Sequence, residues 1–236
     1  MSRTAERHVA APALPGGRPD RWPRGRRSTK LLALLPVHGL ALSLVADGTY
    51  AAALSATDPV ARQVAETQFT LGDGPGLLAA KVAAPVLASD LASMTDARRW
   101  PLFAPQAVEA GARAVYSLPL GTSTVVIGTL DLYRAAAGLP RPDELADAVL
   151  ASDVATSVLT ALDHRPSPDD GVAAWLHETG TGEDEVYHAT GMIMAATGTG
   201  AAEALALLRA RAFREGRTAA DVARDMIHRR IEPGSE

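Results

Sequence analysis

The residues with the most evident chemistry are arginines near the C-terminal end of the chain. Arg209, Arg211, Arg214 and Arg217 lie within nine residues, and Glu215 is the acidic residue among them. A guanidinium carries its N–H donors in a planar fork that pairs bidentately with phosphate. This cluster therefore has the chemistry of a site for a phosphate-bearing polymer.

Planar side chains precede the cluster and further arginines follow it. Tyr187 and His188 come before it, and Arg224, Arg229 and Arg230 come after it. Tyrosine and histidine rings stack on bases that are splayed out of an RNA loop. Rings and guanidinium forks together are the side chains that a site for folded RNA needs.

The charge balance opposes this interpretation. Residues 183–231 contain seven Arg and seven Asp or Glu, and the net charge of the whole chain is −4. Long-range attraction of a nucleic acid must then be weak. Exposed arginines also pair with carboxylates, here Glu203, Asp221 or Asp225, and such pairs contribute little to stability. From charge alone, RNA binding is the weaker interpretation.

No other group of residues indicates catalysis or a metal site. The 236 residues include no cysteine, which excludes disulfides, thiolate ligands and thiol nucleophiles. The six histidines lack metal-ligand spacing, and no Ser, His and Asp set forms a local motif. The loop Gly72–Gly76 lacks the Lys-Ser/Thr pair of a phosphate-binding loop, so a turn that leads into a helix explains it better. We therefore expect no enzyme, no cofactor and no metal.

Three helices are expected to position the arginines. Apolar residues recur at spacings of three and four in three successive segments, which places them on one face of each helix. The segments are 186–197, 201–212 and 219–226. Thr218 and Asp221 have capping-box spacing, and Gly198 and Gly216 lie where the first two helices should end. The pattern predicts a small three-helix bundle.

The order of residues in this bundle follows a family pattern. The matching residues are Glu185–Met194, Ala202–Leu205, Leu208-Arg209, Ala212-Phe213 and Asp221–Ala223. They resemble the ANTAR domain, an RNA-binding module of bacterial transcription antiterminators. The resemblance implies that residues 183–231 bind RNA. The side chains expected to contact RNA are Tyr187, His188, Arg209, Arg211, Arg214, Arg217 and Arg224.

Residues 31–140 have the pattern of a mixed domain with strands and helices. The expected strands are 39–45, 50–54, 86–88, 114–120 and 125–133, and the expected helices are 59–68, 75–82 and 100–111. Turn residues at Asp47-Gly48 and a Gly/Ser/Thr turn after Leu120 predict two antiparallel hairpins. The fold class is therefore α+β, with an antiparallel sheet flanked by helices.

This part of the chain also resembles a family. The matching residues are Gln68–Pro75, Asp90-Leu91, Trp100–Ala104, Gly111, Leu118–Leu120 and Ile127–Arg134. They look like the GAF domains of actinobacterial GAF–ANTAR regulators. The resemblance implies a domain that senses a small ligand or mediates dimerisation, with Phe69, Trp100, Phe103 and Asp131 as candidate pocket residues. Many relatives have a cysteine where this chain has Gly76, so thiol-based sensing is not implied.

The remaining segments connect and flank these domains. Residues 1–30 carry eight Lys or Arg and predict a disordered basic tail, and residues 141–182 predict a helix followed by a linker. One side of that helix carries small and apolar residues, which suits packing on its own sheet or on a second copy equally well. These residues are Leu145, Ala148, Val149, Ser152, Ala155, Thr156 and Leu159. Residues 232–236 form a short tail.

Together these patterns predict a cytoplasmic, non-enzymatic regulator that binds leader RNA stem-loops as a homodimer and promotes transcription antitermination. The apolar run Leu31–Leu35 is too short to span a membrane, and Pro36 interrupts it, so we expect neither an anchor nor an export signal. Two alternatives remain open. The helix pair of residues 200–231 has the spacing of a DNA-binding helix-turn-helix, and the chain also fits a ligand-sensing module that contacts no nucleic acid.

Overall fold

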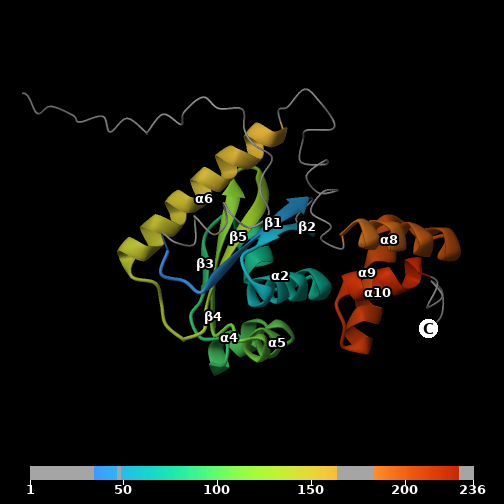
Figure 1. Cartoon of the computed structure of the whole chain (residues 1–236), viewed down its shortest axis with the longest axis horizontal. Coiled ribbons are helices and arrows are strands. Elements are labelled where there is room, and N and C mark those ends of the chain that lie inside the picture. Colours follow the sequence, from blue (N-terminus) through green and yellow to red (C-terminus); the bar gives the residue numbers. More distant parts are fainter. Residues whose placement is uncertain (1–34, 47–48, 164–182, 229–236) are drawn as a thin grey trace, which may run out of the picture.

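The computed structural model of the chain describes residues 35–46, 49–163 and 183–228. The basic tail, the linker from residue 164 to 182, Arg229 and Arg230 lie outside the described residues. A mixed domain of strands and helices occupies the first two ranges, and three helices occupy the last (Figure 1).

Five strands form one antiparallel sheet. They are β1 (Gly39–Ala46), β2 (Thr49–Ala56), β3 (Val86–Ala88), β4 (Ala114–Gly121) and β5 (Val126–Arg134). Their order across the sheet is β2-β1-β5-β4-β3, and every neighbouring pair is antiparallel. Both predicted hairpins, β1–β2 and β4–β5, are confirmed, and so is the α+β class.

Among the described residues, five helices accompany the sheet, where the sequence predicted four. They are α2 (Pro59–Leu71), α3 (Pro75–Val82), α4 (Met94–Arg99), α5 (Phe103–Ala110) and α6 (Pro142–Asp163). The helix expected over residues 100–111 is observed as α5, which begins at Phe103 and is capped by Gly111 as expected, whereas α4 was not predicted. Ser93 begins α4 by accepting a hydrogen bond from Asp96 N at 3.2 Å. Pro101 then forces Trp100 out of helical geometry, to φ −133° and ψ 70°, so α5 begins two residues later.

The mixed domain has three layers. Leu40, Leu42, Leu130 and Leu132 face α6 on one side of the sheet, while their neighbours in sequence face α2, α3 and α5 on the other. Figure 1 shows α6 lying along one side of the sheet and α2 on the other. The alternation of side chains along each strand therefore gives the sheet two separate cores.

Helix α6 packs on the sheet of its own chain. Ala148, Ala155 and Leu159 are buried against that sheet, which confirms the first of the two roles expected for this side. On the outward side, Leu150 and Val154 are 62% and 56% exposed. Any partner helix would have to use this outward side.

The C-terminal bundle consists of α8 (Glu183–Thr197), α9 (Ala201–Glu215) and α10 (Ala219–Ile227). The predicted C-terminal ends of α8 and α9 are confirmed. Gly198 and Gly216, which follow these helices, have positive φ values of 73° and 62°, which suit glycine. Thr218 caps α10 by accepting a hydrogen bond from Asp221 N at 3.1 Å. The core of the bundle is formed by Val186, Ala189, Ile193, Ala204, Leu208, Ala212, Ala219, Val222, Ala223 and Met226.

Within the described ranges, no single helix is long and apolar enough to cross a membrane. The stretches Glu185–Thr197 and Ala201–Glu215 meet the length and composition test only when taken as a pair, across a bend of 108°.

Candidate nucleic-acid interface

Five of the seven predicted RNA-contacting side chains are exposed to solvent: Tyr187, His188, Arg214, Arg217 and Arg224. Tyr187, near the start of α8, is 55% exposed, and His188 beside it is exposed as well. Arg214, in the last turn of α9, is exposed and makes no ion pair with the described part of the chain. Tyr187, His188 and Arg214 can therefore meet a ligand without prior rearrangement.

Two further arginines are paired within or close to α9. Arg211 Nε lies 2.9 Å from a Glu215 carboxylate oxygen. Arg217 contacts the same carboxylate at 3.4 Å and Asp225 at 2.8 Å. The hydrogen bond to Asp225 raises the pKa of the Arg217 guanidinium above its ordinary value. Both guanidinium groups are therefore shared with carboxylates in this state.

Arg224 on α10 is paired in the same way. Its guanidinium contacts Glu185 on α8 at 3.3 Å and Asp221 at 3.0 Å. The hydrogen bond to Glu185 raises the pKa of Arg224. Asp221 and Asp225 were foreseen as partners from the sequence, whereas Glu185 and Glu215 were not. All these pairs lie at or near the surface, where ion pairs are weak and easily exchanged.

Arg209 has a different environment, because it lies against the mixed domain. Its guanidinium carbon is 4.8 Å from the centroid of the Phe69 ring, a cation–π contact. A Cβ atom placed on Gly72 would lie 3.5 Å from Arg209 Nη1, so the side chain also reaches the turn that ends α2. Nε and Nη2 are buried and have no hydrogen-bond partner among the described residues. Burial without an acceptor lowers the pKa of Arg209.

The end of α2 also contacts α10. Ala219 N donates a hydrogen bond to Thr70 Oγ1 at 3.1 Å, which satisfies one of the free N–H groups at the start of α10. Phe69 packs on the core of the bundle. Figure 1 shows the bundle beside α2, away from α6. The bundle and the mixed domain therefore meet at the last turn of α2.

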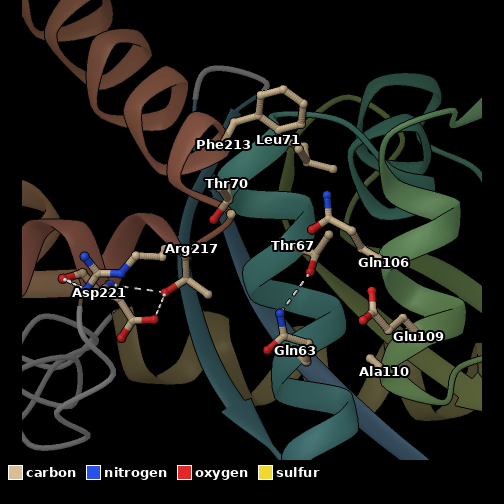
Figure 2. Close-up of a pocket in the computed structure, with 12 residues that line it drawn as sticks. Gln63, Thr67, Thr70, Leu71, Gln106, Glu109, Ala110, Phe213, Arg217 and Asp221 are labelled. Atoms are coloured by element: carbon tan, nitrogen blue, oxygen red, sulfur yellow. Dashed lines mark hydrogen bonds between the residues drawn. The ribbon is translucent and has the colours of Figure 1, made fainter. Parts of the chain in front are cut away.

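A cleft of about 620 Å³ lies along this contact (Figure 2). It is lined by Gln63, Thr67, Thr70, Leu71, Gln106, Glu109, Ala110, Phe213, Gly216, Arg217, Thr218 and Asp221. Helices α2 and α5 supply one wall, and the turn between α9 and α10 supplies the other. No sequence signal indicated this cleft, because its walls come from segments more than a hundred residues apart.

The four candidate pocket residues of the mixed domain lie in different surroundings. Trp100 and Phe103 are 2% and 0% exposed and belong to the core beneath α2 and α3. Phe69 packs both on the bundle core and on the small cluster of Val45 and Ala80 in the mixed domain. Asp131 is 2% exposed on β5. It is therefore a buried residue and not a surface position.

Asp131 is held by a network of buried donors. Gln68 Nε2 donates to its carboxylate at 3.1 Å, Thr129 Oγ1 donates at 3.4 Å, and Ser117 Oγ donates through a short hydrogen bond. Gln68 Oε1 in turn accepts from Gly76 N at 2.7 Å, at the start of α3. The Gly72–Gly76 loop thus uses its first free helix N–H internally, as expected for a turn that leads into a helix.

Sequence reasoning missed Gln68 and Ser117. The register of β4 and β5 could have shown Ser117, because it pairs directly with Asp131. Within the described ranges, no three His, Asp or Glu side chains are placed to hold a metal ion.

Comparison with known protein families supports the family predicted for the C-terminal bundle. The family model of the ANTAR domain matches residues 176–227. Among curated proteins, none matches the chain significantly. A GAF domain/HD domain protein from Geobacter sulfurreducens is similar in structure at 16% identity, with a TM-score of 0.42 over 59% of this chain and 91% of that one. The GAF domain of a two-component sensor histidine kinase from Bacillus halodurans is similar at 13% identity, with a TM-score of 0.40 over 64% and 88%.

The ANTAR match begins before α8 and ends with the last residue of α10. It thus includes all seven candidate RNA-contacting residues. The ANTAR domain predicted from the sequence is confirmed. The chain therefore ends in an ANTAR domain, which follows an α+β domain built on a five-stranded antiparallel sheet.

Proposed function

We propose that this protein is a non-enzymatic transcription regulator that binds RNA stem-loops through its ANTAR domain and promotes antitermination. The observation that carries the proposal is the match of the ANTAR family model to residues 176–227. A protein that holds an antiterminator hairpin in a nascent leader transcript prevents the terminator hairpin from forming. Polymerase then continues into the downstream genes.

The side chains of the bundle supply both kinds of contact that this binding needs. Tyr187 and His188 offer exposed rings on which loop bases stack. Arg214 offers an exposed guanidinium to phosphate. Arg211 and Arg224 can exchange their carboxylate partners for phosphate at little cost, because surface ion pairs contribute about 0–1 kcal/mol. RNA binding would then depend on the positions of these side chains, because the bundle carries no net positive charge.

The N-terminal domain is proposed to sense a small ligand or to mediate dimerisation. Leu150 and Val154 form an exposed apolar row on the outward side of α6, which suits a second copy of the same helix. A dimer would present two bundles to two stem-loops. The second contact then becomes intramolecular, which raises the overall affinity without new contacts.

Duplex DNA fits this geometry less well. A three-residue turn containing Gly216 joins α9 and α10, as in a helix-turn-helix. However, the start of α10 is held by Thr70, and a recognition helix contacts bases with its N-terminal residues.

A fluorescence-anisotropy titration of the full chain with a tandem stem-loop RNA tests the proposal. We expect an affinity that falls as salt rises, because phosphate contacts release counterions. Arg214→Ala should weaken binding about tenfold or more, as for loss of a charge-assisted hydrogen bond. Arg98→Ala is the matched control, because Arg98 is an exposed arginine on α4 of the other domain. Equal weakening by both variants, or a preference for duplex DNA, would reject the proposed site.

A further inference from the structure

One of the seven candidate RNA-contacting residues is covered by the protein itself. Arg209 lies on the ring of Phe69, and its Nε and Nη2 donors are buried without an acceptor. The neighbouring contact from Ala219 N to Thr70 Oγ1 fixes the bundle to the same turn of α2. Two of the three guanidinium nitrogens of Arg209 are therefore out of reach of RNA in this structure.

The contact is poorly suited to a purely structural role. A guanidinium that loses water and gains no acceptor is left with unsatisfied donors, which destabilises the buried state. The cation–π contact with Phe69 offsets part of that loss. A phosphate oxygen would satisfy the same donors fully, through the bidentate geometry that arginine favours. A phosphate would therefore stabilise the Arg209 guanidinium more than its present neighbours do.

We infer that the N-terminal domain restrains the ANTAR domain by sequestering Arg209 against the end of α2, so that docking of the bundle and full RNA binding exclude each other. The inference rests on the proposed function and names how that same site is regulated. Phe69, Thr70 and Gly72 form the docking surface, and the ANTAR bundle of the same chain is its occupant.

The docked state is expected to keep partial affinity for RNA. Tyr187, His188 and Arg214 stay exposed while Arg209 is covered. RNA can therefore begin to bind the docked protein, and release of the bundle adds Arg209 to the interface. Full binding requires molecules in which the bundle is undocked from α2. Any change that weakens docking therefore raises the apparent affinity for RNA.

Two conservative substitutions in α2 test the inference in the full chain. Phe69→Leu keeps an apolar side chain but removes the aromatic face, and Thr70→Val removes the acceptor for Ala219 N. Each should tighten binding of a tandem stem-loop RNA by about three- to tenfold. Met94→Ala is the control, because Met94 is 73% exposed on α4 and should leave the affinity unchanged.

A reversible cross-link tests the opposite direction. The hydrogen bond of 3.1 Å between Ala219 N and Thr70 Oγ1 brings the two residues within reach of a disulfide. The chain has no native cysteine, so Thr70→Cys with Ala219→Cys gives a single defined bond. The oxidised protein should bind RNA at least tenfold more weakly than the reduced protein, and the two single-cysteine variants should not respond to reductant.

The two proposals fail in different ways. RNA binding that is equal in the wild type, Phe69→Leu, Thr70→Val and the oxidised double variant would overturn the inference and leave the proposed function standing. Absence of RNA binding in every form, including the two released variants, would overturn the proposed function and the inference together.

Discussion

Replacing Arg209 by methionine should stabilise the protein. An arginine near a protein surface usually has little effect on stability or increases it. The Nε and Nη2 atoms of Arg209, however, are buried without an acceptor. Methionine has a long unbranched side chain that can lie on the Phe69 ring in the same position, and its sulfur makes favourable contacts with aromatic rings. The change removes unsatisfied donors and keeps the packing.

The expected gain follows from the contacts. Each buried donor left unsatisfied destabilises the folded state by about 1–3 kcal/mol. The cation–π contact with Phe69, which is lost, is worth about 0.5–2 kcal/mol. Two nitrogen atoms without partners therefore outweigh one ring contact, and Arg209→Met should raise the free energy of unfolding by about 1–3 kcal/mol.

Differential scanning calorimetry measures this gain. For a chain of this length, 1 kcal/mol shifts Tm by about 2–4 °C, so an increase of about 2–12 °C is expected. Arg214→Met is the matched control, because Arg214 is exposed on the same helix and its replacement should change stability by less than about 0.5 kcal/mol. A lower Tm for Arg209→Met than for Arg214→Met would show that Arg209 is well satisfied in solution and would refute the reasoning.

Three further outcomes are expected from buried groups. Burial and the hydrogen bond to Asp58 raise the pKa of Tyr133 to about 12; an absorbance titration should show this late ionisation, with the associated stability present below pH 10 and lost as the pH approaches 12. Asp131→Ala leaves buried amide and hydroxyl donors without an acceptor, so urea unfolding should show a loss of about 2–4 kcal/mol. Burial, followed by repulsion from Asp221, raises the pKa of Glu66 above 4.5. The contribution of Glu66 to stability is therefore present below pH 4.5 and is lost as the pH rises through the raised pKa, and the Tm of Glu66→Gln should not show that loss.

Most of the secondary structure was predictable because local patterns and tertiary packing agree. The period-two alternation along β1, β4 and β5 places Leu40, Leu42, Leu130 and Leu132 in one core, as the observed sheet requires. The helix ends at Gly198 and Gly216 follow from the freedom of glycine at positive φ. The helix expected from residue 100 begins at Phe103 instead, because Pro101 disfavours helical geometry at Trp100, and α4 before it was not predicted.

The environments of the arginines were not predictable, because they depend on which segments meet. Charge counting indicated pairing in general, and Asp221 and Asp225 do act as partners. Nothing local indicated that Phe69 would contact the bundle as well as its own domain and lie under Arg209. Sequence could therefore assign chemistry to the bundle, whereas the structure shows which groups are available.

The central claim is that the ANTAR bundle binds folded RNA, and one titration tests it most directly. Labelled tandem stem-loop RNA is titrated with the full chain and with Phe69→Leu at several salt concentrations, beside a strand of the same composition that cannot fold. We predict tight, salt-dependent binding of the stem-loops, tighter for Phe69→Leu, and much weaker binding of the unfolded strand. Equal affinity for both RNAs, or none for either with both proteins, would contradict the account.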